Sequence, residues 1–200
     1  MAAPEEINAD MLAFWNGKGG DIWVARQEYT DITLAPVTDA FLAFASPHAG
    51  ERVVDIGCGC GAPTLEFARA VAPFGRVAGL DISGPMLAEG ERRASAAGIA
   101  NVDWRQADPA TAALDEYDLL ISAFGVMFFG DRVAAFTNMR RAAAPGARMA
   151  LELRHDIRPQ RPRRMSAGVF ISYNCFGRRQ SLCRALTASR GWQRGCSTCS

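Results

Sequence analysis

The segment Val53–Pro63, VVDIGCGCGAP, constrains the fold more than any other part of the chain. An apolar run typical of a buried strand leads into three glycines, and a helix-competent stretch follows them. Such a unit places bare backbone and a helix N-terminus beside a ligand at the carboxyl edge of a parallel sheet. The segment therefore predicts a site for a nucleotide-like ligand.

From Glu51 onward, short apolar runs alternate with longer helix-competent stretches. Strand-like runs occupy residues 52–56, 76–80, 102–105, 117–122 and 148–153. Ala-rich stretches that favour helices occupy residues 63–72, 85–97 and 131–144, with Ser83 and Asp131 in position to cap the second and third. The repetition of strand, helix and strand, with strands expected to be buried and non-alternating, predicts an α/β fold: a doubly wound, Rossmann-like, mostly parallel sheet.

Two helical patterns precede the first strand. Apolar residues recur at helical spacing over residues 5–15 and 28–45, the second pattern being interrupted by Pro36. Residues 16–20, NGKGG, predict a loop between them. We interpret residues 1–48 as an N-terminal helical lid and residues 49–153 as the ligand-binding core.

Composition limits the class of protein. A chain of 200 residues with 49% hydrophobic and 22% charged residues is sufficient for one α/β domain. No run approaches the roughly 18 to 20 apolar residues of a membrane span, and the first ten residues carry acids where a signal peptide carries bases. These features predict a cytoplasmic protein.

The glycine segment leaves two ligands open. Gly57, Gly59 and Ala62 satisfy the dinucleotide pattern G-x-G-x-x-G/A, so an NAD-dependent oxidoreductase is one alternative. Asp55 favours S-adenosylmethionine over NAD, because a carboxylate so close to the loop would repel the pyrophosphate of NAD by roughly 4 kcal/mol at 4 Å. S-adenosylmethionine carries an ammonium and a sulfonium and no phosphate, so the same carboxylate attracts it.

Two further acids follow the next strands. Asp81 ends residues 76–81, where a carboxylate can accept hydrogen bonds from both ribose hydroxyls. Asp108 follows the third strand and is expected to accept from the adenine amino group, although an Asp before Pro109 is also an ordinary turn residue. Ile82 and Met86 are expected to sandwich the adenine ring.

In order and spacing, the motifs DIGCGCG, LDIS, QAD, YDLLIS and AAPGAR resemble those of class I S-adenosylmethionine-dependent methyltransferases, nearest to the ubiquinone/menaquinone-biosynthesis-like group (methyltransferase type 11/25 domains). The resemblance covers residues 8–153. It implies that the acid at the end of the first strand and the glycines hold the methionine moiety. The acid after the second strand would then hold the ribose, and the acid after the third strand would hold the adenine. The N-terminal WNG and WVARQ resemble the part of that pattern in which a helix covers the cofactor. The expected cofactor-binding residues are Asp55, Gly57, Cys58, Gly59, Asp81, Ile82, Met86, Ala107, Asp108, Ser122 and Gln27.

Methyl transfer from a sulfonium needs alignment of the acceptor and exclusion of water rather than a metal or a covalent nucleophile. Residues 124–129, FGVMFF, follow the fourth strand, where this fold lines the acceptor pocket, and they are apolar. The Asn/Asp-Pro-Pro-aromatic motif of amino-directed nucleic-acid methyltransferases is absent. We therefore expect a small apolar acceptor rather than a nucleic acid. The sequence identifies no general base.

The last part of the chain differs from the rest. Residues 1–153 hold 12 Lys and Arg against 20 Asp and Glu, whereas residues 154–200 hold 10 against 1. The fold normally ends with two further strands, and neither is evident here, so we expect the C-terminal strands to be missing or aberrant. A shifted reading frame near Arg154 explains the change best. A basic extension that binds nucleic acid and a zinc site are alternatives, the latter from Cys175, Cys183, Cys196 and Cys199. A truncated cofactor-binding remnant without activity is the corresponding functional alternative.

Overall fold

The computed structural model describes residues 4–154 and 168–174. The helices are α1 (Pro4–Trp15), α2 (Lys18–Ala25), α3 (Gln27–Ala45), α4 (Ala62–Val71), α5 (Gly84–Ala96), the short 3-10 helix η1 (Gly125–Phe128) and α6 (Arg132–Ala142). The strands are β1 (Arg52–Ile56), β2 (Arg76–Asp81), β3 (Val102–Gln106), β4 (Tyr117–Ala123), β5 (Ala143–Arg154) and β6 (Gly168–Asn174). The expected α/β architecture is confirmed.

All the strands belong to one sheet of order β3-β2-β1-β4-β5-β6. The first five in this order are parallel, and β6 is antiparallel to β5. The chain leaves β1 toward β2 on one side and returns to β4 on the other, so the strand order reverses between β1 and β4. In sheets of this kind ligands bind beyond the carboxyl ends of the strands at such a reversal.

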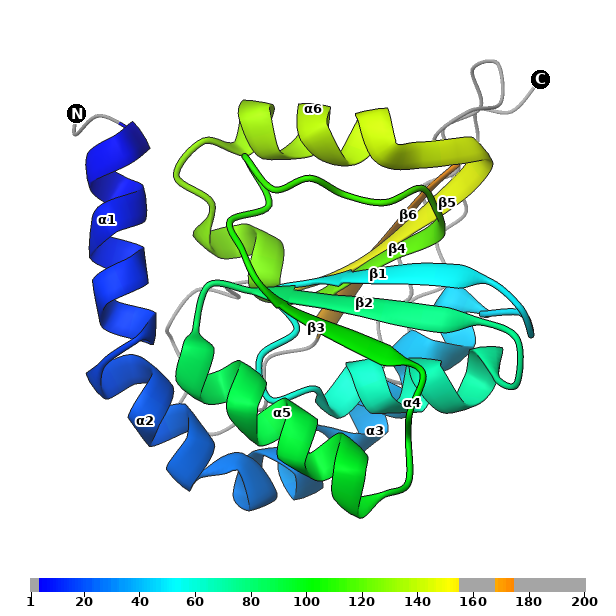
Figure 1. Ribbon diagram of the computed structural model, residues 1–200, viewed down its shortest axis with the longest axis horizontal. Coiled ribbons are helices and arrows are strands. Elements are labelled where there is room, and N and C mark those ends of the chain that lie inside the picture. The colour runs from blue at the N-terminus through cyan, green and yellow to red at the C-terminus, as the bar shows by residue number, and fades with distance from the viewer. Residues whose placement is uncertain (1–3, 155–167, 175–200) are drawn as a thin grey trace, which may run out of the picture.

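Helices cover both faces of the sheet. Figure 1 shows α6 on one side and α3, α4 and α5 on the other. One buried apolar cluster joins α3 and α4 to the sheet through residues such as Phe41, Phe67 and Ile121. A second cluster joins α6 to the opposite face through Met139 and Leu120. Burial on both faces explains why the central strands β1 and β4 are largely apolar.

The predicted loop over residues 16–20 is wrong for Lys18–Gly20, which begin α2. Composition favoured a loop, but tertiary packing makes these glycines helical. A Cβ on Gly19 would overlap the ring of Phe14, and one on Gly20 would overlap the carbonyl oxygen of Trp15. The glycines therefore allow α1 and α2 to meet closely. In addition, α3 continues through Pro36, where an interruption was expected.

One strand lies beyond Arg154, where the sequence analysis found none. It is β6, which pairs with β5 from Arg148↔Asn174 to Arg154↔Gly168. The expectation of missing C-terminal strands is thus wrong for this one, which covers the edge of β5. The four cysteines considered for zinc lie outside the described residues. The division at residues 48 and 153 and the shifted reading frame stay predictions. In the part of the chain that the structure describes, no helix is both long and apolar enough to cross a membrane.

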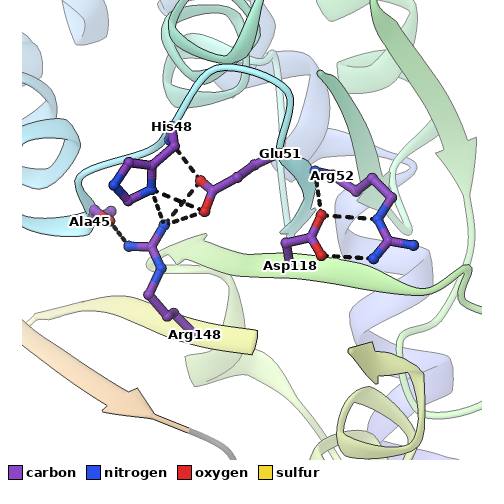
Figure 2. A network of polar contacts seen from close by, with 6 residues as sticks. All are labelled: Ala45, His48, Glu51, Arg52, Asp118 and Arg148. Carbon is purple, nitrogen blue, oxygen red and sulfur yellow. Dashed lines mark hydrogen bonds and ion pairs between the residues drawn. The ribbon is translucent and has the colours of Figure 1, made fainter. Parts of the chain in front are cut away.

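Charged side chains tie the strands together at the amino edge of the sheet (Figure 2). The Arg52 guanidinium donates to both carboxylate oxygens of Asp118, from Nε at 2.9 Å and from Nη2 at 2.7 Å. Arg148 donates to both oxygens of Glu51 at 2.7 and 2.9 Å and to the carbonyl oxygen of Ala45 at the end of α3. This network lies at the amino ends of the strands, and the glycine loop lies at their carboxyl ends. The network therefore stabilises the sheet without occupying the space beside the glycine loop.

Candidate functional site

The glycine loop follows β1 at the reversal point of the sheet. Gly57, Gly59 and Gly61 all have positive φ angles, of 72°, 56° and 79°. A Cβ on Gly57 would lie 2.6 Å from the Cα atom of Gly125, so a side chain there would push the loop away from the start of η1. Backbone without side chains therefore faces the space beyond the sheet, as expected from the sequence.

Asp81 connects this loop to the end of β2. Its Oδ2 accepts a hydrogen bond from the backbone N–H of Gly59 at 2.8 Å, and its Oδ1 accepts from that of Ser83 at 2.8 Å. Burial raises the pKa of Asp81, while these backbone donors act to lower it. The N–H of Ile82 also lowers the pKa of this carboxyl, and since each carboxylate oxygen has two acceptor sites, the group can still accept a hydrogen bond from a ligand.

Asp55 is 1% exposed and points from β1 toward the same space. Its Oδ2 accepts from the hydroxyl of Thr64 at 2.7 Å, whereas its Oδ1 is buried without a hydrogen-bond partner among the described residues. Burial, more than the nearby charge of Asp81, raises the pKa of Asp55 to about 7. A positive charge nearby favours the ionised form of such a buried carboxyl group, and its open acceptor atom suits a cationic ligand.

These groups border one large cavity of about 1120 Å³. It is lined by ten of the eleven expected cofactor-binding residues: Gln27, Asp55, Gly57, Cys58, Gly59, Asp81, Ile82, Met86, Ala107 and Asp108. The side chain of Asp108 also accepts from the backbone N–H of Ala110 at 2.8 Å, so it forms the turn that the sequence allowed as well. The structure thus brings these residues together around one space.

Ser122 is the exception and does not line the cavity. It is fully buried, donates to the carbonyl oxygen of Ile56 at 2.6 Å and accepts from the backbone N–H of Val126 at 3.2 Å. These bonds join β1, β4 and η1. Ser122 therefore holds the wall of the cavity in place rather than facing its interior.

The N-terminal helices close the cavity on the side of Asp81. The carbonyl oxygen of Trp15 accepts from the hydroxyl of Ser83 at 2.6 Å. Asn16 donates to the carbonyl oxygen of Ile82 at 2.8 Å and accepts from the backbone N–H of Gly84 at 3.0 Å. The sequence analysis gave Asn16 no role, although it stands in the WNG pattern. These contacts fix the turn between α1 and α2 to the loop after β2.

Aromatic rings extend this cover toward the apolar segment after β4. The ring of Trp15 contacts that of Phe128 edge-on, with centroids 5.5 Å apart, and that of Trp23 at 6.1 Å. Trp15, Trp23 and Phe128 all line the cavity. Gln27, at the start of α3, is also buried there and donates to Asp31 at 2.6 Å, while its side-chain oxygen has no partner among the described residues.

Most of the apolar segment predicted to form the acceptor pocket lines the same cavity. The lining includes Phe124, Gly125, Met127, Phe128 and Phe129. Opposite Ala123, β5 contributes Glu152, a residue that the sequence analysis did not select. An acid within the apolar run Met149–Leu153 was the available signal. The cavity therefore has a charged end near Asp55 and Asp81 and a largely apolar wall after β4.

Comparison with known proteins agrees with this geometry. Residues 53–146 match the family model described as "Methyltransferase domain". The chain is 32% identical over 117 residues to aklanonic acid methyltransferase DauC of Streptomyces sp. (strain C5), a match that covers 58% of this chain and 53% of that protein. It is 34% identical over 107 residues to the ubiquinone/menaquinone biosynthesis C-methyltransferase UbiE of Saccharophagus degradans, covering 52% of this chain and 43% of that protein. The chain thus matches about half the length of these curated relatives.

A solved structure shows the same fold. It is the crystal structure of a SAM-dependent methyltransferase from Aquifex aeolicus, which aligns with a TM-score of 0.57 at 20% sequence identity. The alignment covers 62% of this chain and 68% of that one. At this level of identity the likeness supports the architecture of the sheet and its helices.

Proposed function

We propose that this chain, whose residues 53–146 match the model of a methyltransferase domain, transfers a methyl group from S-adenosylmethionine to a small, largely apolar acceptor. The observation that carries the proposal is the buried Oδ1 of Asp55 beside the glycine loop, which has no hydrogen-bond partner in the described part of the chain. An acceptor atom in that state is costly unless a ligand donates to it. The ammonium of the methionine moiety is a donor of the required charge.

The residues present fit this donor molecule. Asp55 and the loop Gly57–Gly59 would hold its methionine end, Asp81 its ribose, and Ile82, Met86, Ala107 and Asp108 its adenine. When bound, S-adenosylmethionine supplies a methyl group activated by the sulfonium. The protein contributes positioning and the exclusion of water, which the contacts of Trp15 with Ser83 and Phe128 support.

The acceptor belongs on the other side of the cavity. Phe124, Met127, Phe128 and Phe129 give that wall its apolar character, which favours a ring system over a sugar or a nucleic acid. By their names, the two relatives act on aklanonic acid and in ubiquinone/menaquinone biosynthesis. We therefore place the acceptor of this chain among small apolar ring compounds.

Titration calorimetry with S-adenosylhomocysteine and, separately, with NAD⁺ tests the proposal. We expect the first to bind and the second not to bind. Binding of NAD⁺ without binding of S-adenosylhomocysteine would favour the oxidoreductase alternative, which the relatives named above do not support. The inactive-remnant alternative and the cytoplasmic location stay predictions.

A further inference from the structure

Glu152 is a buried carboxyl group that the cofactor site does not use. It is 2% exposed, lines the cavity from β5, and its Oε1 has no hydrogen-bond partner among the described residues. Burial raises the pKa of Glu152 to about 7, and no charged neighbour contributes to that shift. Among residues 4–154 and 168–174, Oε1 therefore has no partner that would explain its burial.

The register places Glu152 beside the acceptor wall. It pairs with Ala123 at the end of β4, and its backbone carbonyl oxygen accepts from the N–H of Phe124 at 2.9 Å. Ala123 and Phe124 both line the cavity. By contrast, Asp55 pairs with Ile121, which pairs with Ala150, so Glu152 lies two residues further along the strands than Asp55. At about 3.3 Å per residue, the two acids occupy different levels of the cavity.

We propose that Glu152 binds the acceptor: its carboxylate accepts a hydrogen bond from a hydroxyl on an otherwise apolar ring and takes the proton of that hydroxyl. This inference rests on the proposed function. The proton moves from the hydroxyl oxygen to a carboxylate oxygen of Glu152, and the electron pair that held it stays on the acceptor oxygen. That pair forms the new bond to the methyl carbon as the carbon–sulfur bond of the donor breaks, leaving S-adenosylhomocysteine.

A neutral hydroxyl fits this position better than a cationic amine. An ammonium would have to lose a proton before it could accept a methyl group, and it would be desolvated against the phenylalanine wall. A phenol remains neutral in such a site and has one polar hydrogen to donate. A base with a pKa near neutrality is suited to receive that proton.

The test compares three probes in the presence of S-adenosylhomocysteine: naphthol, its methyl ether, and naphthylmethylammonium. Affinities are measured by calorimetry for the wild-type protein, Glu152→Leu and Glu66→Leu. Glu66 is the matched control, because it lines the same cavity but is paired with Arg69 on α4. We expect the wild-type protein and Glu66→Leu to bind naphthol about tenfold more tightly than the ether, the ratio for one hydrogen bond to a charged group. Glu152→Leu should bind the two about equally.

The melting temperature of Glu152→Leu separates a role in binding from a structural role, in which case the variant would melt at a lower temperature than the wild-type protein. The Glu152→Leu variant should melt at the same or a higher temperature than the wild-type protein, because it removes an unsatisfied buried carboxyl group. It should also bind S-adenosylhomocysteine as the wild-type protein does. The inference is overturned if the wild-type protein binds naphthol and its ether equally, or binds neither of them. It is also overturned if the preference for naphthol survives in Glu152→Leu, or if the wild-type protein prefers the ammonium probe. If the wild-type protein does not bind S-adenosylhomocysteine, the proposed function itself is overturned.

Discussion

The backbone N–H of Gly59 donates to Oδ2 of Asp81 at 2.8 Å, so the side chain that ends β2 holds the loop that follows β1. The two residues are 22 positions apart, and their contact joins neighbouring parallel strands at the edge where ligands bind. One carboxylate thus shapes the loop and is available to a ribose at the same time.

Replacing Asp81 by Ala should weaken binding of S-adenosylhomocysteine by about 1.5 to 3 kcal/mol, because it removes a charged hydrogen-bond acceptor. Calorimetric titration measures the loss. Asp103→Ala is the control, since Asp103 lies on the neighbouring strand β3 in an exposed pair with Arg105. Unchanged affinity in Asp81→Ala would mean that the ribose binds elsewhere.

Gly57→Ala should destabilise the protein by more than Gly98→Ala. Both glycines have positive φ angles, 72° and 66°, so both substitutions impose backbone strain of about 1 kcal/mol. The new methyl group meets the Cα of Gly125 at 2.6 Å in the first variant and nothing within 4 Å in the second. Overpacking should add about 1 to 3 kcal/mol in Gly57→Ala alone. Urea denaturation of both variants checks this, and equal losses would contradict the close approach of the loop to η1.

The free energy of unfolding should fall as the pH rises from about 4 through 7. Burial raises the pKa of both Asp55 and Glu152 to about 7, so the folded state binds more protons than the unfolded state in this range. Stability from a raised carboxyl pKa is present below the unfolded value and is lost as the pH passes the folded value. The pKa of Asp118 is shifted the other way, being lowered by its hydrogen bonds from Arg52. That contribution is lost only below about pH 4.

Denaturation at pH 5.5 and pH 8 with Glu152→Gln separates these effects. The wild-type protein should be more stable at the lower pH, and the variant should show a smaller difference. Parallel behaviour of the two proteins would show that Glu152 titrates as an ordinary exposed acid.

Replacing Arg148 by Met should lower the free energy of unfolding by about 1 to 2 kcal/mol. The guanidinium joins Glu51 to the carbonyl oxygen of Ala45, so its loss frees the end of α3 from β5 (Figure 2). Arg92→Met is the control, because Arg92 is exposed and pairs with Glu89 within α5, and it should change stability little. If the two variants lose the same amount, the network does not hold α3.

Local sequence patterns were sufficient to predict the five parallel strands and the position of the cavity, but not β6. Apolar runs located the five parallel strands, and the glycines after β1 with the acid after β2 located the cavity. These signals are local, because a short stretch in which an apolar strand leads into glycines is compatible with few other structures. The helix over Lys18–Gly20 was missed because close packing of Phe14 and Trp15 outweighs the composition of that stretch.

Other features depended on burial and on the direction of side chains. Ser122 was selected from its motif, yet it alternates with Ile121 and Ala123 along β4, and period-two alternation would have placed it on the other face. The raised pKa of Asp55 follows from its burial, which one sequence does not show. Glu152 is one acid in an apolar strand, and its importance emerges only when β5 is aligned with β4.

Hydrogen bonds run without a break from Gly59 through Asp81 and Ser83 to the carbonyl of Trp15, whose ring then touches Phe128. The same tryptophan is thereby fastened to the donor side of the cavity and packed on the acceptor side. Occupancy of one half should therefore change the affinity of the other. Because such coupling is reciprocal, the factor by which the bound donor changes the affinity for the acceptor equals the factor by which the bound acceptor changes the affinity for the donor.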